Sequence, residues 1–282
     1  MRTYAEPRRG VGLSGPSPSV VAWGTADVTS WHRAAETAAI VGSVALCVIV
    51  AGPGSAIERL FIPLFGSADD PTQRLTALAF GIPLGVLLVP GLAVWAWGPR
   101  LRPSGTALTS LATLAVSFDL AFEGGLTAFG WALLAALWLL VTYQLLTFRA
   151  VDTIVRRPVV LTLAVLACVA PWIVQSVRVM MDISGGSLDG DHIFVVVLAV
   201  VLSLLLVLPL LRLESFAVAG VVAAVGAIIY SLMSLLWETS AAALPRIVAV
   251  PAVAAAVAYI DTIRHLAAKF RRYRASKGGH PE

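Results

Sequence analysis

The sequence predicts an all-α polytopic bundle of about eight membrane-spanning helices, and three observations support this fold class. Of the 282 residues, 59% are hydrophobic and only 13% are charged, about half the charged fraction of a typical soluble domain. The apolar residues gather in runs of about 20, the length that an α-helix needs to cross a ~30 Å hydrocarbon core. Charged residues, prolines and glycines separate these runs, as expected for loops outside the lipid.

Each expected span is a predominantly apolar run bounded by charge, proline or glycine. In chain order, the runs lie at about 34–52, 74–97, 105–123, 126–147, 158–177, 193–211, 215–237 and 245–263. Residues 1–30 contain the segment GVGLSGPSPS and no sustained apolar run, so we expect a flexible tail there. Residues 31–263 then form the transmembrane helical domain, and residues 264–282 form a basic tail.

The distribution of lysine and arginine predicts that both chain ends are cytoplasmic. Cytoplasmic loops of membrane proteins retain an excess of these residues. With eight crossings and a cytoplasmic N-terminus, only Arg59, Arg74, Arg178 and Arg246 of the 20 Lys and Arg residues fall on the outer side. Omitting one internal span would reverse the side of every later loop and remove this asymmetry. The sequence therefore predicts a multi-pass protein of the cell membrane.

The eighth run leads into a basic segment, TIRHLAAKFRRYRASKGGHPE, which we expect to continue as a short helix and then fray. Basic residues near a bilayer surface attract anionic headgroups by roughly 1 kcal/mol each. The headgroup contacts expected here are Lys269, Arg271, Arg272 and Arg274. The predicted partners are therefore the lipid bilayer and its anionic lipids. The scatter of the other basic residues between apolar runs argues against nucleic acid.

Side-chain size predicts how the later helices pack. The run at 215–237 is rich in small residues, namely Ala219, Gly220, Ala223, Ala224, Gly226 and Ala227, and the run at 245–263 contains PAVAAAVAY from Pro251. Close backbone approach drives helix association in lipid, so we expect these two helices to pack together in the interior. The segment FVVVLAVVLSLLL, 194–206, is bulky on all sides, which indicates a helix largely exposed to lipid.

An acidic pair, Asp119 and Glu123, lies at the end of the third expected span, in the segment VSFDLAFEGG. If this span begins near Thr106, a rise of 1.5 Å per residue places Asp119 on the order of 10 Å below the outer boundary of the hydrocarbon core. The i, i+4 spacing puts both acids on one face, where ionised carboxylates repel each other. Intramembrane acids are costly unless they face an interior cavity. The pair therefore predicts a proton- or cation-binding site, with Arg178 as its expected partner.

A second interpretation of the same segment needs no function. The helix would end before the acids, both side chains would be solvated at the membrane rim, and Gly124 and Gly125 would form the turn into the next span. The glycines fit either interpretation, so the depth of Asp119 decides between them.

The second expected span contains two prolines, Pro83 and Pro90, in the segment GIPLGVLLVPG. Proline removes an intrahelical hydrogen bond and kinks the helix, and transporters use broken helices to build sites at mid-membrane depth. A purely structural kink is the alternative, because proline is common in membrane helices.

The loop segment MDISGGSLDGDH provides four candidate metal ligands, Asp182, Asp189, Asp191 and His192. Oxygen ligands on a Gly/Ser-rich backbone suit Ca²⁺ or another hard cation. The spacing differs from that of an EF-hand loop, so a solvated acidic loop is the alternative.

Three functional classes stay open. The sequence lacks the GxxxxGK[ST], HExxH and GxSxG motifs, so we predict no cofactor and do not expect redox or zinc-hydrolase chemistry. The first class is a permease-like transporter of a small solute or ion, coupled to protons through the acidic pair. The second is a non-transporting subunit, assembly factor or sensor that binds a membrane or cytoplasmic protein. The third is a membrane-embedded lipid-modifying enzyme.

Overall fold

The computed structural model describes Thr37, Val41 and residues 71–98, 101–124, 159–186, 192–240 and 242–277. The chain divides into two compact units, Met1–Thr37 and Ala38–Glu282, and all the helices described below belong to the second. Every regular element in the described ranges is a helix, which confirms the all-α class. The expected span at 126–147 lies outside the described residues, as does the one at 34–52 apart from Thr37 and Val41, which are helical.

The described helices follow the apolar runs closely. They are α3 (Pro71–Ile82), η1 (Pro83–Leu88), α4 (Val89–Trp97), α5 (Arg102–Gly124), α7 (Val159–Ser184), α8 (Ile193–Leu211), α9 (Leu213–Leu236) and α10 (Arg246–Lys277). Together, α3, η1 and α4 form the second expected span. The helix α10 continues through the boundary predicted for the basic tail, so the expected basic helical extension is confirmed.

Within the described ranges, five helical stretches are long and apolar enough to cross a membrane. They are Arg74–Trp97, Val159–Ser184, Ile193–Leu211, Ser215–Leu236 and Arg246–Lys269. These helices are typical of a multi-pass integral membrane protein. The third expected span forms the helix α5, and its crossing of the membrane stays a prediction, as does the total of eight spans.

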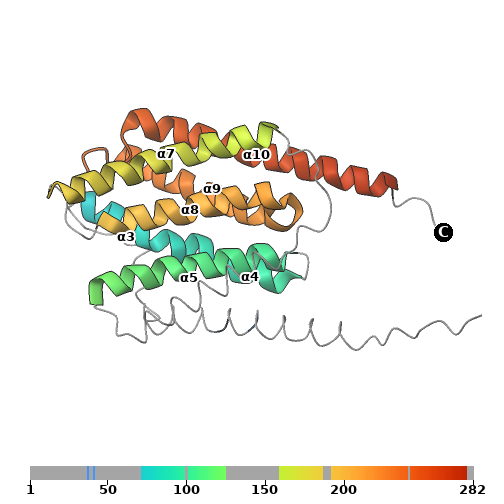
Figure 1. Cartoon of the computed structure of the whole chain (residues 1–282), viewed down its shortest axis with the longest axis horizontal. Helices are drawn as coiled ribbons and strands as arrows, with labels where there is room; N and C mark the ends of the chain where they lie inside the picture. The colour runs from blue at the N-terminus through green and yellow to red at the C-terminus, as the bar shows by residue number, and fades with distance from the viewer. Residues whose placement is uncertain are drawn as a thin grey trace, which may run out of the picture. The chain divides into compact units, whose positions relative to one another are not determined.

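The helices α8 and α9 lie at the centre of this arrangement (Figure 1). On one side of them lie α7 and α10, which pack against each other, and on the other side lie α5 and the broken helix α3–η1–α4. The prediction that α8 faces mainly lipid is therefore wrong. Ten of its 19 residues are buried, including Leu198, Leu202 and Leu205.

The physical reason for this error is that hydrocarbon and a helix interface are equally apolar. A bulky side chain therefore does not distinguish them, whereas its neighbours do. Leu202 of α8 packs beside Gly226 of α9, where an added Cβ would lie only 3.3 Å from Leu202 Cδ2. The large residues of α8 fill the space that the small residues of α9 leave.

The predicted packing of α9 against α10 is confirmed. At Gly220 an added Cβ would collide with the Tyr259 hydroxyl of α10 and would lie 2.7 Å from Pro209 Cγ of α8. The prediction that α10 lies in the interior is wrong. Only 28% of the residues in its apolar part are buried, compared with 56% in α8. Ile247, Val250 and Val257 form part of its exposed face.

The outer face of α7 also exposes large apolar side chains, including Leu163, Leu166, Ile173 and Val177. In water, a continuous apolar face of this kind is rare on a monomer. In a bilayer the same face contacts acyl chains at no cost. The exposed surfaces of α7 and α10 thus support the membrane assignment independently of the hydropathy of the sequence.

Candidate functional site

At Pro83 the second span changes to a π-helical segment, η1, of six residues, and the backbone stays helical on both sides of it. The amide of Val89 donates to the carbonyl of Leu84, five residues earlier, instead of four. Neither proline has an N–H, so each leaves the normal helical hydrogen bond unformed. Short π segments inside α-helices are frequent at functional sites. The second span therefore changes its hydrogen-bond register where the sequence predicts a kink, while the helix itself continues through Trp97.

The helix α5 packs against this broken helix and against α8 and α9. Two glycines allow very close approach at the α4–α5 contact. A Cβ at Gly91 would lie 2.8 Å from Thr109 Oγ1, and a Cβ at Gly105 would lie 2.6 Å from the backbone nitrogen of Trp95. The hydroxyl of Ser104 donates to the carbonyl of Ser215 at 2.6 Å, which joins α5 to the start of α9.

A row of hydroxyl side chains along α5 is buried, although most of the surrounding residues are apolar. At helical spacing, the row consists of Thr106, Thr109, Ser110, Thr113 and Ser117, each at most 5% exposed. Two of them are satisfied by their own helix, because Thr109 and Thr113 each donate to the carbonyl four residues earlier at 2.8 Å. The buried Ser117 Oγ has no hydrogen-bond partner in the described structure.

The acid positions lie beyond this row, near the end of α5, and at 100° per residue they fall on a different face of the helix. The helix runs through Gly124 and includes both Asp119 and Glu123, so it does not end before them as the second interpretation requires. From Thr109, which lies against Gly91, ten residues along α5 correspond to a rise of about 15 Å to Asp119. That distance brings its backbone near the level where α3 meets η1. The side chains of both acids lie outside the described structure, so their exposure stays a prediction.

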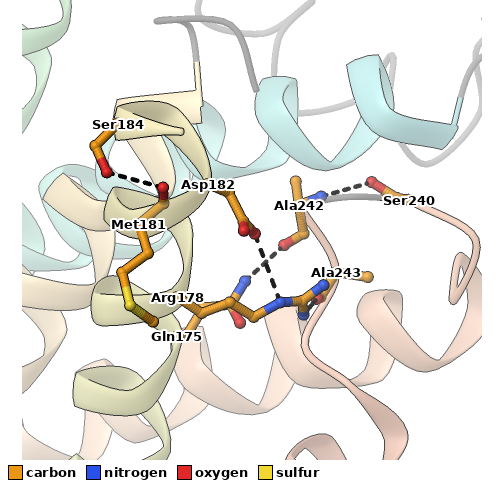
Figure 2. Close-up of polar contacts among 8 residues, drawn as sticks. All are labelled: Gln175, Arg178, Met181, Asp182, Ser184, Ser240, Ala242 and Ala243. Carbon is orange, nitrogen blue, oxygen red and sulfur yellow. Dashed lines mark hydrogen bonds and ion pairs between the residues drawn. The ribbon is translucent and has the colours of Figure 1, made fainter. Parts of the chain in front are cut away.

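Arg178, the expected partner of the acids, contacts other groups in the described structure. Its Nη1 donates to the carbonyl of Ala243 at 3.2 Å, and its Nε lies 3.8 Å from Asp182 Oδ2 (Figure 2). Its helix, α7, packs against α8 and α10, whereas α5 packs on the opposite side of α8 and α9. The structure therefore places Arg178 with the connector between α9 and α10, residues 237–245.

A polar cluster that the sequence did not predict includes Gln175 and Ala242, which Figure 2 shows, and Tyr230. The buried Gln175 donates through Nε2 to the carbonyl of Ala242 at 3.1 Å, and Tyr230 OH donates to the same carbonyl at 2.9 Å. The Tyr230 ring lies 5.6 Å from the Trp172 ring. The only sequence signals were an amide and a phenol within apolar runs, because the acceptor is the backbone of an alanine. These contacts fix the connector on α7.

Loss of both donors to Ala242 is expected to destabilise the connector more than the sum of the single losses. Tyr230→Phe or Gln175→Met alone leaves one donor on the buried carbonyl, and we expect about 1 kcal/mol from each. The double variant leaves the carbonyl without a donor, so we expect a coupling of roughly another 1 kcal/mol. Denaturant unfolding in detergent micelles measures all four proteins. Strictly additive losses would contradict the shared-acceptor interpretation.

The four candidate metal ligands are not assembled in the described structure. Asp182 lies beside Arg178, His192 is buried at the start of α8, and Asp189 and Asp191 lie outside the described residues. The described ranges contain no group of three or more His, Cys, Asp or Glu residues that could hold a metal ion. A metal site in this loop therefore stays a prediction.

The cationic positions of the tail lie on the continuation of α10. Lys269 and Arg272 are exposed, and Arg271 and Arg274 belong to the same helix, with side chains outside the described structure.

No protein-family model, curated protein or solved structure matches this chain. Its function is therefore argued from the geometry and chemistry of these sites.

Proposed function

We propose that this protein is a permease-like transporter of a small solute or ion in the cell membrane, coupled to protons through the acid positions of α5. The observation that carries the proposal is the juxtaposition of two features. The π-helical segment η1 packs against α5, and α5 carries both the buried hydroxyl row and, further along on another face, Asp119.

A transport path through hydrocarbon needs polar groups to replace the water that a solute loses. Hydroxyl side chains and the carbonyls freed in a broken helix supply such groups at mid-membrane depth. The unpartnered hydroxyl of Ser117 is one group of this kind, two residues before Asp119. An acid further along the same helix, on another face, supplies a site that can exchange a proton, and acids inside membranes are a recurrent part of proton relays.

The proposal includes both chain ends in the cytoplasm, since this orientation leaves the fewest basic residues outside. Asp119 then lies in the outer half of the bilayer and is reached from the outside. We expect Asp119→Cys, in a background without Cys47 and Cys168, to react with a membrane-impermeant thiol reagent added to intact cells. A position 119 that fails to react under conditions that label an outer-loop cysteine would contradict the proposed outward-facing cavity.

Proton coupling is tested by Asp119→Asn in reconstituted vesicles loaded with a pH-sensitive dye. Sodium, potassium, amino acids, sugars and carboxylates are added in turn, and the internal pH is followed. We expect at least one addition to change the pH with the wild-type protein and none to do so with Asp119→Asn. Asp261→Asn is the matched control, because Asp261 is an exposed acid of α10 that lies 3.5 Å from His265.

Equal pH changes with the wild type and Asp119→Asn would remove the acid from the mechanism. The alternative class, a partner-binding subunit, makes the opposite set of predictions. Asp119→Asn would then have no effect, whereas deletion of 264–282 or changes in 182–192 would abolish recovery of a partner protein.

A further inference from the structure

A pocket of about 420 Å³ opens between the beginning of α9 and the later part of α10. Its walls are small or branched apolar residues, and one lining residue is charged. The α9 side consists of Ala217, Val218 and Val221, and the α10 side includes Ile263, Ala267 and Arg264. We infer that this pocket binds one anionic phospholipid, with the phosphate at Arg264 and part of an acyl chain against the apolar walls.

The pocket exists because α9 and α10 are in close contact at Gly220 and Tyr259, whereas one turn nearer to the beginning of α9 both helices carry small residues. At Gly220 the backbone of α9 meets the Tyr259 hydroxyl, and an added Cβ would lie 3.3 Å from Ile263 Cδ1. Nearer the helix ends, Ala217 and Ala267 do not fill the space between the axes. The Gly220–Tyr259 contact therefore closes the end of the pocket that lies deeper between the two helices. The other end, near the beginning of α9 and the later part of α10, stays open.

Most of the charged positions around the open end are basic, although Glu214 is the second residue of α9. Arg264 is exposed at the pocket, and Arg212, also exposed, directly precedes α9. The continuation of α10 adds the exposed Lys269 and Arg272. A nearby acid, Asp261, lies within ion-pair distance of His265. The balance of these groups favours an anionic occupant.

The depth of the pocket favours a lipid over a soluble anion. The uncharged run of α10 extends from Ile247 to Ile260, and Arg264 lies four residues beyond it, about 6 Å along the helix. That level corresponds to the boundary between acyl chains and headgroups, where long basic side chains reach toward phosphates. A free phosphate would use Arg264 but would leave the apolar walls without a partner. A phospholipid matches both parts of the pocket.

The inference is tested by lipid retention. The full-length protein is reconstituted in vesicles of phosphatidylcholine mixed with phosphatidylglycerol and re-extracted in mild detergent, and the bound lipids are measured per protein. We expect the wild type to retain phosphatidylglycerol preferentially. Arg264→Gln should lower this retention about fivefold, which corresponds to the roughly 1 kcal/mol that one basic residue contributes at a bilayer surface, and Arg264→Lys should largely preserve it.

A second variant separates the pocket from its charge. Val218→Trp fills the apolar part and leaves Arg264 in place, so we expect retention to fall as well. Val225→Trp is the matched control, since Val225 is an exposed residue of the same helix outside the pocket, and it should retain the wild-type amount. Size-exclusion chromatography verifies that each variant is folded.

Three results would overturn the inference. The first is wild-type retention in both Arg264→Gln and Val218→Trp. The second is equal retention of the two lipids by the wild type. The third is a loss in Lys269→Gln as large as in Arg264→Gln with none in Val218→Trp, which would indicate diffuse attraction to the basic tail. Lipid retention is measured without transport, so its outcome is independent of the proposed permease activity.

Discussion

Gly105→Ala is expected to separate α4 from α5 and to destabilise the protein more than an alanine at Gly91, Gly220 or Gly226. The new Cβ would lie 2.6 Å from Trp95 N and 2.7 Å from the carbonyl oxygen of Gly91. Both atoms belong to the backbone, so no side-chain rotation relieves the overlap. The helices must move apart, and overpacking of this kind costs about 1–3 kcal/mol or more.

The measurement is the thermal unfolding midpoint of the purified protein in detergent, together with the yield of monodisperse protein. Ala96→Val is the matched control, because Ala96 is an exposed position on α4. The added methyl groups of valine would lie at the exposed surface. We expect a large decrease in the midpoint for Gly105→Ala and almost none for Ala96→Val. Equal midpoints for Gly105→Ala and the wild type would show that α4 and α5 do not pack as closely as described.

Gly220→Ala is expected to produce the second large effect, because three helices meet at this residue. The added Cβ would overlap the Tyr259 hydroxyl and would lie 2.7 Å from Pro209 Cγ. The hydroxyl is held in place by its hydrogen bond to the carbonyl of Leu206, at 2.8 Å. Relief of the overlap therefore breaks that hydrogen bond or displaces α10, at a cost of about 1–3 kcal/mol.

Gly226→Ala adds the same methyl group to the same helix at a position with more space, so its effect is compared with that of Gly220→Ala. Its added Cβ would meet only side-chain methyl groups, Ile82 Cγ2 at 3.2 Å and Leu202 Cδ2 at 3.3 Å, which can yield by a few tenths of an ångström. We expect the midpoint to decrease clearly less for Gly226→Ala than for Gly220→Ala. The reverse order would contradict the packing described at the α8–α9–α10 junction. Combining Gly220→Ala with Tyr259→Leu should recover part of the loss.

Much of the fold follows from the sequence because membrane helices need long apolar runs. The same rule predicts the interruption of the second span, since Pro83 and Pro90 cannot donate backbone hydrogen bonds. The packing of α9 on α10 follows from Gly220 and its small neighbours. The burial of α8 does not follow, because a leucine such as Leu202 is equally suited to lipid and to a helix interface.

Among the candidate sites, too, some features can be predicted from the sequence and others cannot. The acids near the end of α5 are predicted as polar residues in an apolar run, whereas the buried hydroxyl row on the same helix is found only in the structure. The partners of Gln175, Tyr230 and Arg178 are backbone carbonyls of alanines, and such an acceptor has no signature in the sequence. Charge alone therefore suggested Asp119 as the partner of Arg178, whereas the fold provides Asp182 and the α9–α10 connector.

The π-helical register of η1 has a consequence for changes in chain length. In a continuous α-helix, deleting one residue rotates everything beyond it by about 100° and moves its buried face out of contact. The Val89–Leu84 hydrogen bond of η1 encloses one more residue than the corresponding hydrogen bond of an α-helix does. Removal of one residue between 83 and 88 would return this turn to α-helical spacing while α3 and α4 keep their orientations. The second span is thus the one described helix in which a single-residue deletion preserves which side chains face the core.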